Sequence, residues 1–110
     1  MTDLEQVDIQ IELANRLRKM RDTCVKLTES EPFRDVITEG YFKEEAARLV
    51  MAKSASLTPE QIQIIDNMQY GIGALANFIE SVMRRGAEMD QAVGEHEETR
   101  EEILAEEVAV

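Results

Sequence analysis

The side chains that could do chemistry are few in this sequence, and they lie far apart. His96 lies among glutamates in EHEE, but the chain has no second histidine, and Cys24 is its only cysteine. A zinc site needs three or four such ligands. Glu44 and Glu45 are adjacent, so on a helix they diverge and cannot act as a paired carboxylate site. No serine stands in a recognisable nucleophile motif with a histidine. We therefore expect no catalytic residue, no metal and no cofactor.

Two glycines in NMQYGIGALANF, Gly71 and Gly73, raise the question of a phosphate-binding loop. Such a loop follows a strand and carries a further glycine or a Lys-Ser/Thr pair, and neither is present here. Both glycines interrupt an apolar helical pattern around Ile72, where each costs about 1 kcal/mol relative to alanine. With Ala74 and Ala76 they form a patch of small residues. This patch predicts the close approach of another helix, with a local kink as the alternative.

The apolar residues predict an all-α fold. They make up 44% of the 110 residues, aromatic residues only 5%, and Trp is absent, a composition typical of helical bundles and coiled coils. Residues 3–29 predict one amphipathic helix with a basic middle, either a solvated face or a docking surface for an acidic partner. Its apolar residues recur at steps of three and four: Leu4, Val7, Ile11, Ala14, Leu17, Met20, Cys24 and Leu27.

A second helix is predicted from SEPF, because Ser30 can cap a helix and Pro32 fits only its first turn. Gly40 predicts a kink, or a break into two shorter helices. The apolar face of this stretch is expected to fill the core: Phe33, Val36, Ile37, Tyr41, Phe42, Ala46, Leu49 and Val50.

The third helix has the strongest start signal. In SLTPEQI, Thr58 is a cap residue, Pro59 takes the first helical position and Gln61 completes a capping box. Beyond it, apolar residues alternate steps of three and four as in a heptad a/d stripe: Ile65, Met68, Ile72, Leu75, Ile79 and Val82. We predict that this stripe, with Gly71 and Gly73, forms a helix–helix interface and that the chain associates with itself through it.

The charge is strongly acidic, at −11 overall, which argues against direct binding to nucleic acid or to an anionic membrane. Residues 95–110 hold seven glutamates and one arginine. We therefore divide the chain into a helical domain, 1–94, and an acidic tail, 95–110, expected to be marginal helix or disordered. Within the tail, Ile103, Leu104 and Val108 could anchor a partner. The chain has no run of 18 apolar residues and an acidic start, so we expect a soluble cytoplasmic protein.

Three stretches, FRDVITEGYFKEEAARL, LTPEQIQIIDNMQYGIGAL and EETREEILAEE, together resemble small, mostly uncharacterised helical proteins encoded by tailed bacteriophages, often near the genes for virion parts. The pattern covers roughly residues 1–105 and carries over no site residue. What the resemblance implies is a non-enzymatic part or helper of virion assembly, present in the host cytoplasm or incorporated into the virion.

Together these patterns predict an all-α protein of three or four amphipathic helices, a small bundle or coiled-coil-like form with an acidic C-terminal tail. We expect it to bind copies of itself and at least one other protein through its helices. The alternative is an acidic inhibitor that mimics nucleic acid and binds a nucleic-acid-binding protein of the host or phage. Mimicry needs carboxylates spread over a folded face, whereas here they are concentrated in a tail expected to be mobile.

Overall fold

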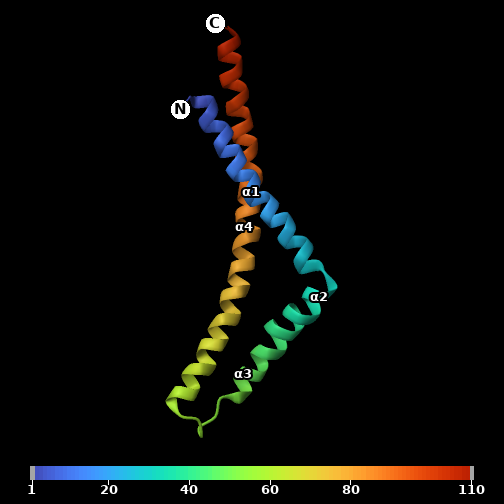
Figure 1. The fold of residues 1–110 in the computed structure, drawn as a ribbon, viewed down its shortest axis with the longest axis vertical. Helices are drawn as coiled ribbons and strands as arrows, with labels where there is room; N and C mark the ends of the chain where they lie inside the picture. Colours follow the sequence, from blue (N-terminus) through green and yellow to red (C-terminus); the bar gives the residue numbers. More distant parts are fainter. Residues whose placement is uncertain (1, 110) are drawn as a thin grey trace. The chain divides into compact units, whose positions relative to one another are not determined.

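A computed structural model of the protein describes residues 2–109, and this part of the chain is all-helical (Figure 1). Five elements follow one another: α1 Asp3–Glu29, α2 Glu31–Phe33, the π-helix η1 Arg34–Glu45, α3 Ala46–Ala52 and α4 Pro59–Ala109. Because α2, η1 and α3 are continuous, residues 2–109 form three helical stretches. The prediction of an all-α fold is confirmed for these residues, whereas a closed bundle stays a prediction.

Helix ends lie where the sequence places its capping residues. The Thr58 backbone N–H donates to Gln61 Oε1 at 2.8 Å, and the Gln61 N–H donates to Thr58 Oγ1 at 3.2 Å, which confirms the predicted capping box. Ser30 Oγ accepts from the Phe33 N–H at 3.4 Å, as expected of the cap before Pro32. A second box, between Thr2 and Glu5, follows the same spacing as Thr58–Gln61 and was not predicted.

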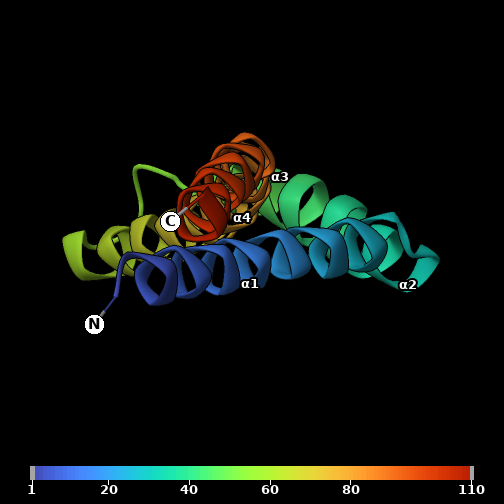
Figure 2. The same ribbon diagram turned by 90° about the horizontal axis from the view of Figure 1, so that it is seen from above.

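The chain divides into two compact units. Unit 1 comprises the described residues up to 25 and from 81, and unit 2 comprises residues 26–80. In unit 1 the first part of α1 lies beside the last part of α4 (Figures 1 and 2), and the two run in opposite directions, as Figure 1 shows. Its ion pairs Asp8–Arg100 and Arg18–Asp90 fix the register, since in each pair the residue numbers add to 108.

The core of unit 1 is thin. Ala14, Val82 and Val93 are its buried apolar side chains, each at most 6% exposed. Beyond Ala14 the apolar stripe predicted for α1 is partly wrong, because Met20 is 51% exposed. Arg18 and Arg21 turn toward α4 in its place, drawn by their ion pairs to Asp90. We call the antiparallel pair of α1 and the last part of α4 the hairpin of unit 1, although residues 26–80 connect its two helices.

Unit 2 pairs η1 and α3 with the first part of α4. Leu49 and Ile72 are its buried apolar side chains, and Lys53 Nζ lies 2.6 Å from Asp66 Oδ1 beside the connecting loop. The expectation that residues 33–50 fill the core is wrong for Val36 and Val50, which are exposed. For Val36 the reason is the π-helix, whose wider turn spreads residues spaced by three and four over several sides. Val50 lies in α3, on a different side of that helix from the buried Leu49.

Two boundaries predicted from the sequence do not appear as breaks. Gly40 lies inside η1, and the continuous helical stretch through it contradicts a division into two shorter helices at this point. Gly94 lies inside α4, which continues to Ala109, so residues 95–109 are helical. The domain boundary at residue 94 and a separate acidic tail beyond it stay predictions.

Candidate protein-binding surfaces

An apolar open surface of unit 2 consists of two adjoining hollows that share Tyr41 and Glu45. One has a volume of about 150 Å³ and lies between η1–α3 and α4. The other is wider, about 510 Å³, and lies on η1. We call them together the unit 2 groove; the other residues that line it are Val36, Ile37, Gly40, Leu49, Met68, Gly71 and Ile72.

An open apolar stripe on α4 extends this groove. Ile64, Met68, Gly71, Leu75 and Phe78 follow one another at steps of four and three, so they share one side of the helix. Ile64 is 60% exposed, Met68 44% and Phe78 56%. This side lies next to the buried one centred on Ile72, and it leaves large apolar side chains in contact with water.

The carboxylate at the groove, that of Glu45, is paired with a cation of the same chain. Glu45 accepts two hydrogen bonds from the Arg48 guanidinium, one of them at 2.9 Å, and this pairing holds the pKa of the Glu45 carboxyl below its usual range. A Cβ built on Gly71 would lie 3.7 Å from Tyr41 Oη, an ordinary van der Waals distance. Gly71 therefore contributes open space to the groove, and the helices do not press on it.

Some residues of the predicted helix–helix interface are buried within the protein, and others are exposed to solvent. Ile72 and Val82 are buried, Ile65, Leu75 and Ile79 are half-buried, and Met68, Gly71 and Gly73 are exposed. Within the described chain neither glycine lies at a close contact, because a Cβ built on Gly73 would meet nothing within 4 Å. Self-association through this stripe stays a prediction, and the burial of Ile72 and Val82 leaves fewer of its side chains available for it.

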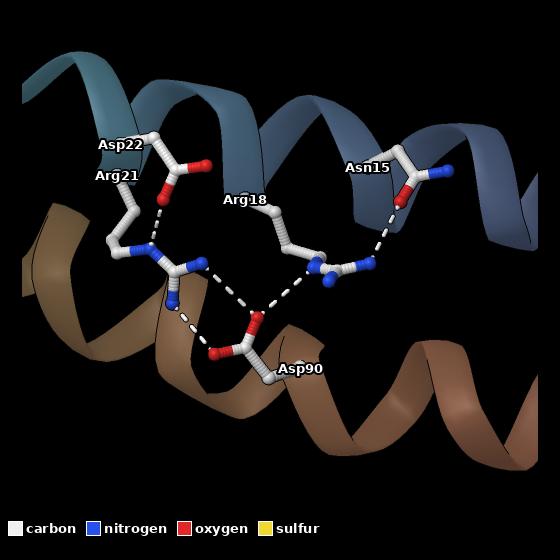
Figure 3. Close-up of polar contacts among 5 residues, drawn as sticks. All are labelled: Asn15, Arg18, Arg21, Asp22 and Asp90. Carbon is white, nitrogen blue, oxygen red and sulfur yellow. Dashed lines mark hydrogen bonds and ion pairs between the residues drawn. The ribbon is translucent and has the colours of Figure 1, made fainter.

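The close helix approach occurs instead in unit 1, at Gly86. A Cβ built there would come within 3.0 Å of both Cβ and Cγ of Arg21. The Arg21 stem therefore crosses α4 over a residue that has no side chain. One helical turn further along, its guanidinium reaches Asp90, with Nη1 2.7 Å from Oδ2 and Nη2 3.1 Å from Oδ1 (Figure 3).

Arg18 completes this ion-paired cluster. Its Nε donates to Asp90 Oδ1 at 2.9 Å, and Arg21 Nε donates to Asp22 Oδ1 at 2.7 Å. The Arg21 guanidinium, and secondarily that of Arg18, holds the pKa of Asp90 below its usual range, while Asp90 and then Asp22 raise the pKa of Arg21. Arg18 and Arg21 belong to the basic middle of α1, for which a solvated face or a docking surface was predicted; both are engaged within the chain, where they hold α1 to α4.

The remaining candidates for chemistry stay apart. His96 and Cys24 are both half-buried. Among residues 2–109 no three side chains of His, Cys, Asp or Glu come together in a group that could hold a metal ion.

The three apolar residues proposed as a tail anchor differ in their exposure, and the anchor itself stays a prediction. Ile103 and Leu104 are half-buried, and Ile103 lines a hollow together with Leu4 of α1. Val108 is 87% exposed. Arg100 Nε lies 2.8 Å from Asp8 Oδ1, which also holds this part of α4 against α1. Two of the three residues are therefore directed toward their own chain.

No protein-family model, curated protein or solved structure matches the chain. In the part of the chain that the structure describes, no helix combines the length and the hydropathy that a membrane span requires. Of the unit 2 groove, only its α4 side was predicted from the sequence, because the π-helix that shapes the other side has no recognised sequence signal.

Proposed function

We propose that the protein is a non-enzymatic interaction component that binds other proteins, including copies of itself, through its helices. The observation that carries the proposal is the unit 2 groove with its adjoining stripe on α4. Val36, Ile64, Met68 and Phe78 are each between 44% and 65% exposed there. Apolar side chains left in water on one side of a helix are typical of a surface that another protein covers.

The shape and chemistry of the groove suit an apolar face of a partner helix. Such a helix presents residues at steps of three, four and seven, and these fit a groove between helices. Fully burying one large apolar side chain contributes about 1.5–3 kcal/mol. Four side chains that are already half-covered would thus contribute roughly 4 kcal/mol, equivalent to millimolar binding. Polar contacts or multivalency must supply the rest, which suits a component of a repeating assembly.

The resemblance to small phage-encoded helical proteins gives the partner class. We infer a structural part or assembly helper of a phage virion, acting in the host cytoplasm or carried into the particle. The partner would be a virion protein with an exposed amphipathic helix.

The test is capture of partners from the native source, with identification by mass spectrometry. The variant carries Val36→Glu and Met68→Glu, which place charges in the groove at exposed positions. Tyr70→Glu is the matched control, because Tyr70 is 82% exposed but lies roughly 200° around α4 from Met68. We expect the wild type and the control to capture a virion protein and the groove variant to lose it. Capture that survives in the groove variant would reject the groove as the binding surface.

A second candidate function is supported by the helical order of residues 95–109. The seven glutamates between Glu95 and Glu107 are all exposed, and they project from one helix. An acidic inhibitor of a nucleic-acid-binding protein would use this display of carboxylates. In the same capture experiment it would recover a polymerase, nuclease or repressor, and 0.5 M salt would release that protein far more readily than one held by apolar contacts.

A further inference from the structure

The hairpin of unit 1 has one ion-paired side and one apolar side. The ion pairs Asp8–Arg100 and Arg18–Asp90 mark the first side. Residues 9, 13, 16 and 20 of α1 follow one another at steps of four and three, so they share a different side of that helix. Ile9, Leu13 and Met20 among them are 40%, 47% and 51% exposed. Leu17 and Cys24, next to this row, are half-buried.

On α4, residues 88, 92, 95 and 99 follow one another at steps of four and three, so they share one side of the helix. This side of α4 borders the apolar side of the hairpin. Residues 90, 97 and 101 lie on the ion-paired side, where Glu97 and Glu101 line a hollow with Asp8. The apolar side is therefore a band between the two helices, with Leu13, Leu17 and Met20 on α1 and Met89, Ala92 and the half-buried His96 on α4. Its outer edge carries Arg16 along α1, and Glu88 and Glu95 along α4.

Two helices with so thin a core leave the side chains of this apolar band partly exposed to water. Four-helix bundles resolve the same problem by packing two hairpins against each other along their apolar sides. We propose that two copies of the chain pack in this way, with α1 of each copy lying antiparallel on α4 of the other. The two hairpins then point in the same direction, related by a two-fold axis parallel to the helices.

The charged residues at the outer edges of the band favour a second copy of the chain as the partner, and they favour this orientation. Arg16 is exposed and forms no ion pair within residues 2–109, although Glu12 lies four positions away. Residues of α1 and α4 whose numbers add to 108 lie at the same height along the hairpin, so position 16 lies level with position 92. In the proposed pair Arg16 therefore lies opposite Ala92 of the second copy, between Glu88 and Glu95. If the two hairpins pointed in opposite directions, the glutamate edge of one α4 would face that of the other, and like charges would repel.

This inference deepens the self-association named in the proposed function and rests on it, while the unit 2 groove plays no part in it. The first measurement is sedimentation equilibrium of the full chain. We expect a dimer, and we expect Leu13→Glu to raise its dissociation constant at least about a hundredfold, because two apolar contacts per dimer acquire a charge. Met20→Glu is a second variant at an equally exposed position. Val108→Glu, at an 87% exposed position off the band, should leave the dimer unchanged.

A charge exchange tests the orientation itself. Arg16→Glu alone and Glu95→Arg alone should each weaken the homodimer by about tenfold, because each places like charges together twice. Mixed in equal amounts, the two variants should form a heterodimer of wild-type affinity. At one contact the two substituted positions then face each other with opposite charges, and at the other the native Arg16 faces the native Glu95. These substitutions lie at exposed positions, and circular dichroism verifies that the helices are intact.

Three results would overturn the inference. They are a monomer at about 100 μM, a dimer unaffected by Leu13→Glu and Met20→Glu, or a mixture no tighter than either charge variant alone. None of them bears on the unit 2 groove, whose test is partner capture by the Val36 and Met68 variants. A monomer that still captures a virion protein through the groove would thus reject the dimer and leave the proposed binding function intact.

Discussion

Replacement of Gly86 by alanine should destabilise the protein, although the same change at other glycines of α4 should stabilise it. In a helix interior, Gly→Ala contributes about 1 kcal/mol of stability. At Gly94 and Gly73 a new Cβ meets nothing within 4 Å, so that gain should appear undiminished. At Gly86 the new Cβ comes within 3.0 Å of the Arg21 Cβ, an atom that no rotamer change can move.

The expected magnitude follows from these two opposing effects. Overpacking of a close contact costs about 1–3 kcal/mol, and the backbone-proximal position of the clash argues for the upper end. Subtracting the helix gain leaves a net loss of about 2 kcal/mol for Gly86→Ala. Against a gain of about 1 kcal/mol for Gly94→Ala, the two variants should differ by about 3 kcal/mol.

Urea unfolding followed by circular dichroism measures this difference. With a slope of about 1–3 kcal/mol per molar urea, the two midpoints should lie more than about 1 M apart, with the wild type between them. Gly94→Ala is the matched control, because it lies in the same helix and the same unit. A Gly86→Ala variant as stable as Gly94→Ala would refute the close approach of α1 and α4 at this position.

Three further predictions follow from buried and ion-paired residues. Ile72→Asp should unfold unit 2, because the new carboxylate would be buried at a position 8% exposed, and thermal unfolding should show this loss whatever the oligomeric state. Asp90→Asn should lower the free energy of unfolding at neutral pH. Because the pKa of Asp90 is depressed in the folded state, the carboxylate stabilises the fold above the ordinary aspartate pKa of about 3.9. The difference in urea midpoint between variant and wild type should vanish as pH falls through the lower, folded pKa. A chain ending at Gly94 should lose helicity at the start of α1, where Asp8 loses Arg100, and amide hydrogen exchange should detect the loss.

The helices were predictable from the sequence because their ends are local features. Thr58 and Gln61 make their bonds within one turn, and Ser30 does the same before Pro32. No distant partner is needed to read such signals. The Thr2–Glu5 box uses the same spacing as Thr58–Gln61 and was available to the same reasoning.

The packed faces were less predictable, because they depend on pairs distant in sequence. Nothing near Arg21 indicates that Gly86 lets its stem cross α4, or that Asp90 lies within reach. This pairing turns the buried face of α1 toward Arg18 and Arg21 and leaves Met20 exposed. The same limit applies to the glycines, since Gly71 and Gly73 fit a close-contact pattern and Gly86 makes the contact.

The candidate site was predicted only in part. Met68, Gly71 and Ile72 were identified from the heptad pattern of α4, and all three line the unit 2 groove. Tyr41 and Glu45 were not, because α-helical periodicity assigned η1 to the core. A π-helix changes which residues share a side, so a pattern based on 3.6 residues per turn misplaces them.

Site-specific photo-crosslinking in the native source tests the central claim most directly. A photoreactive residue is placed at Met68 in the groove, at Tyr70 on another side of α4, and at Glu98 on the acidic helix, all exposed positions. Protein binding through the unit 2 groove predicts a crosslinked virion protein from position 68 and none from positions 70 or 98. Crosslinks from position 98 alone, to a nucleic-acid-binding protein, would contradict the account and support the acidic inhibitor instead.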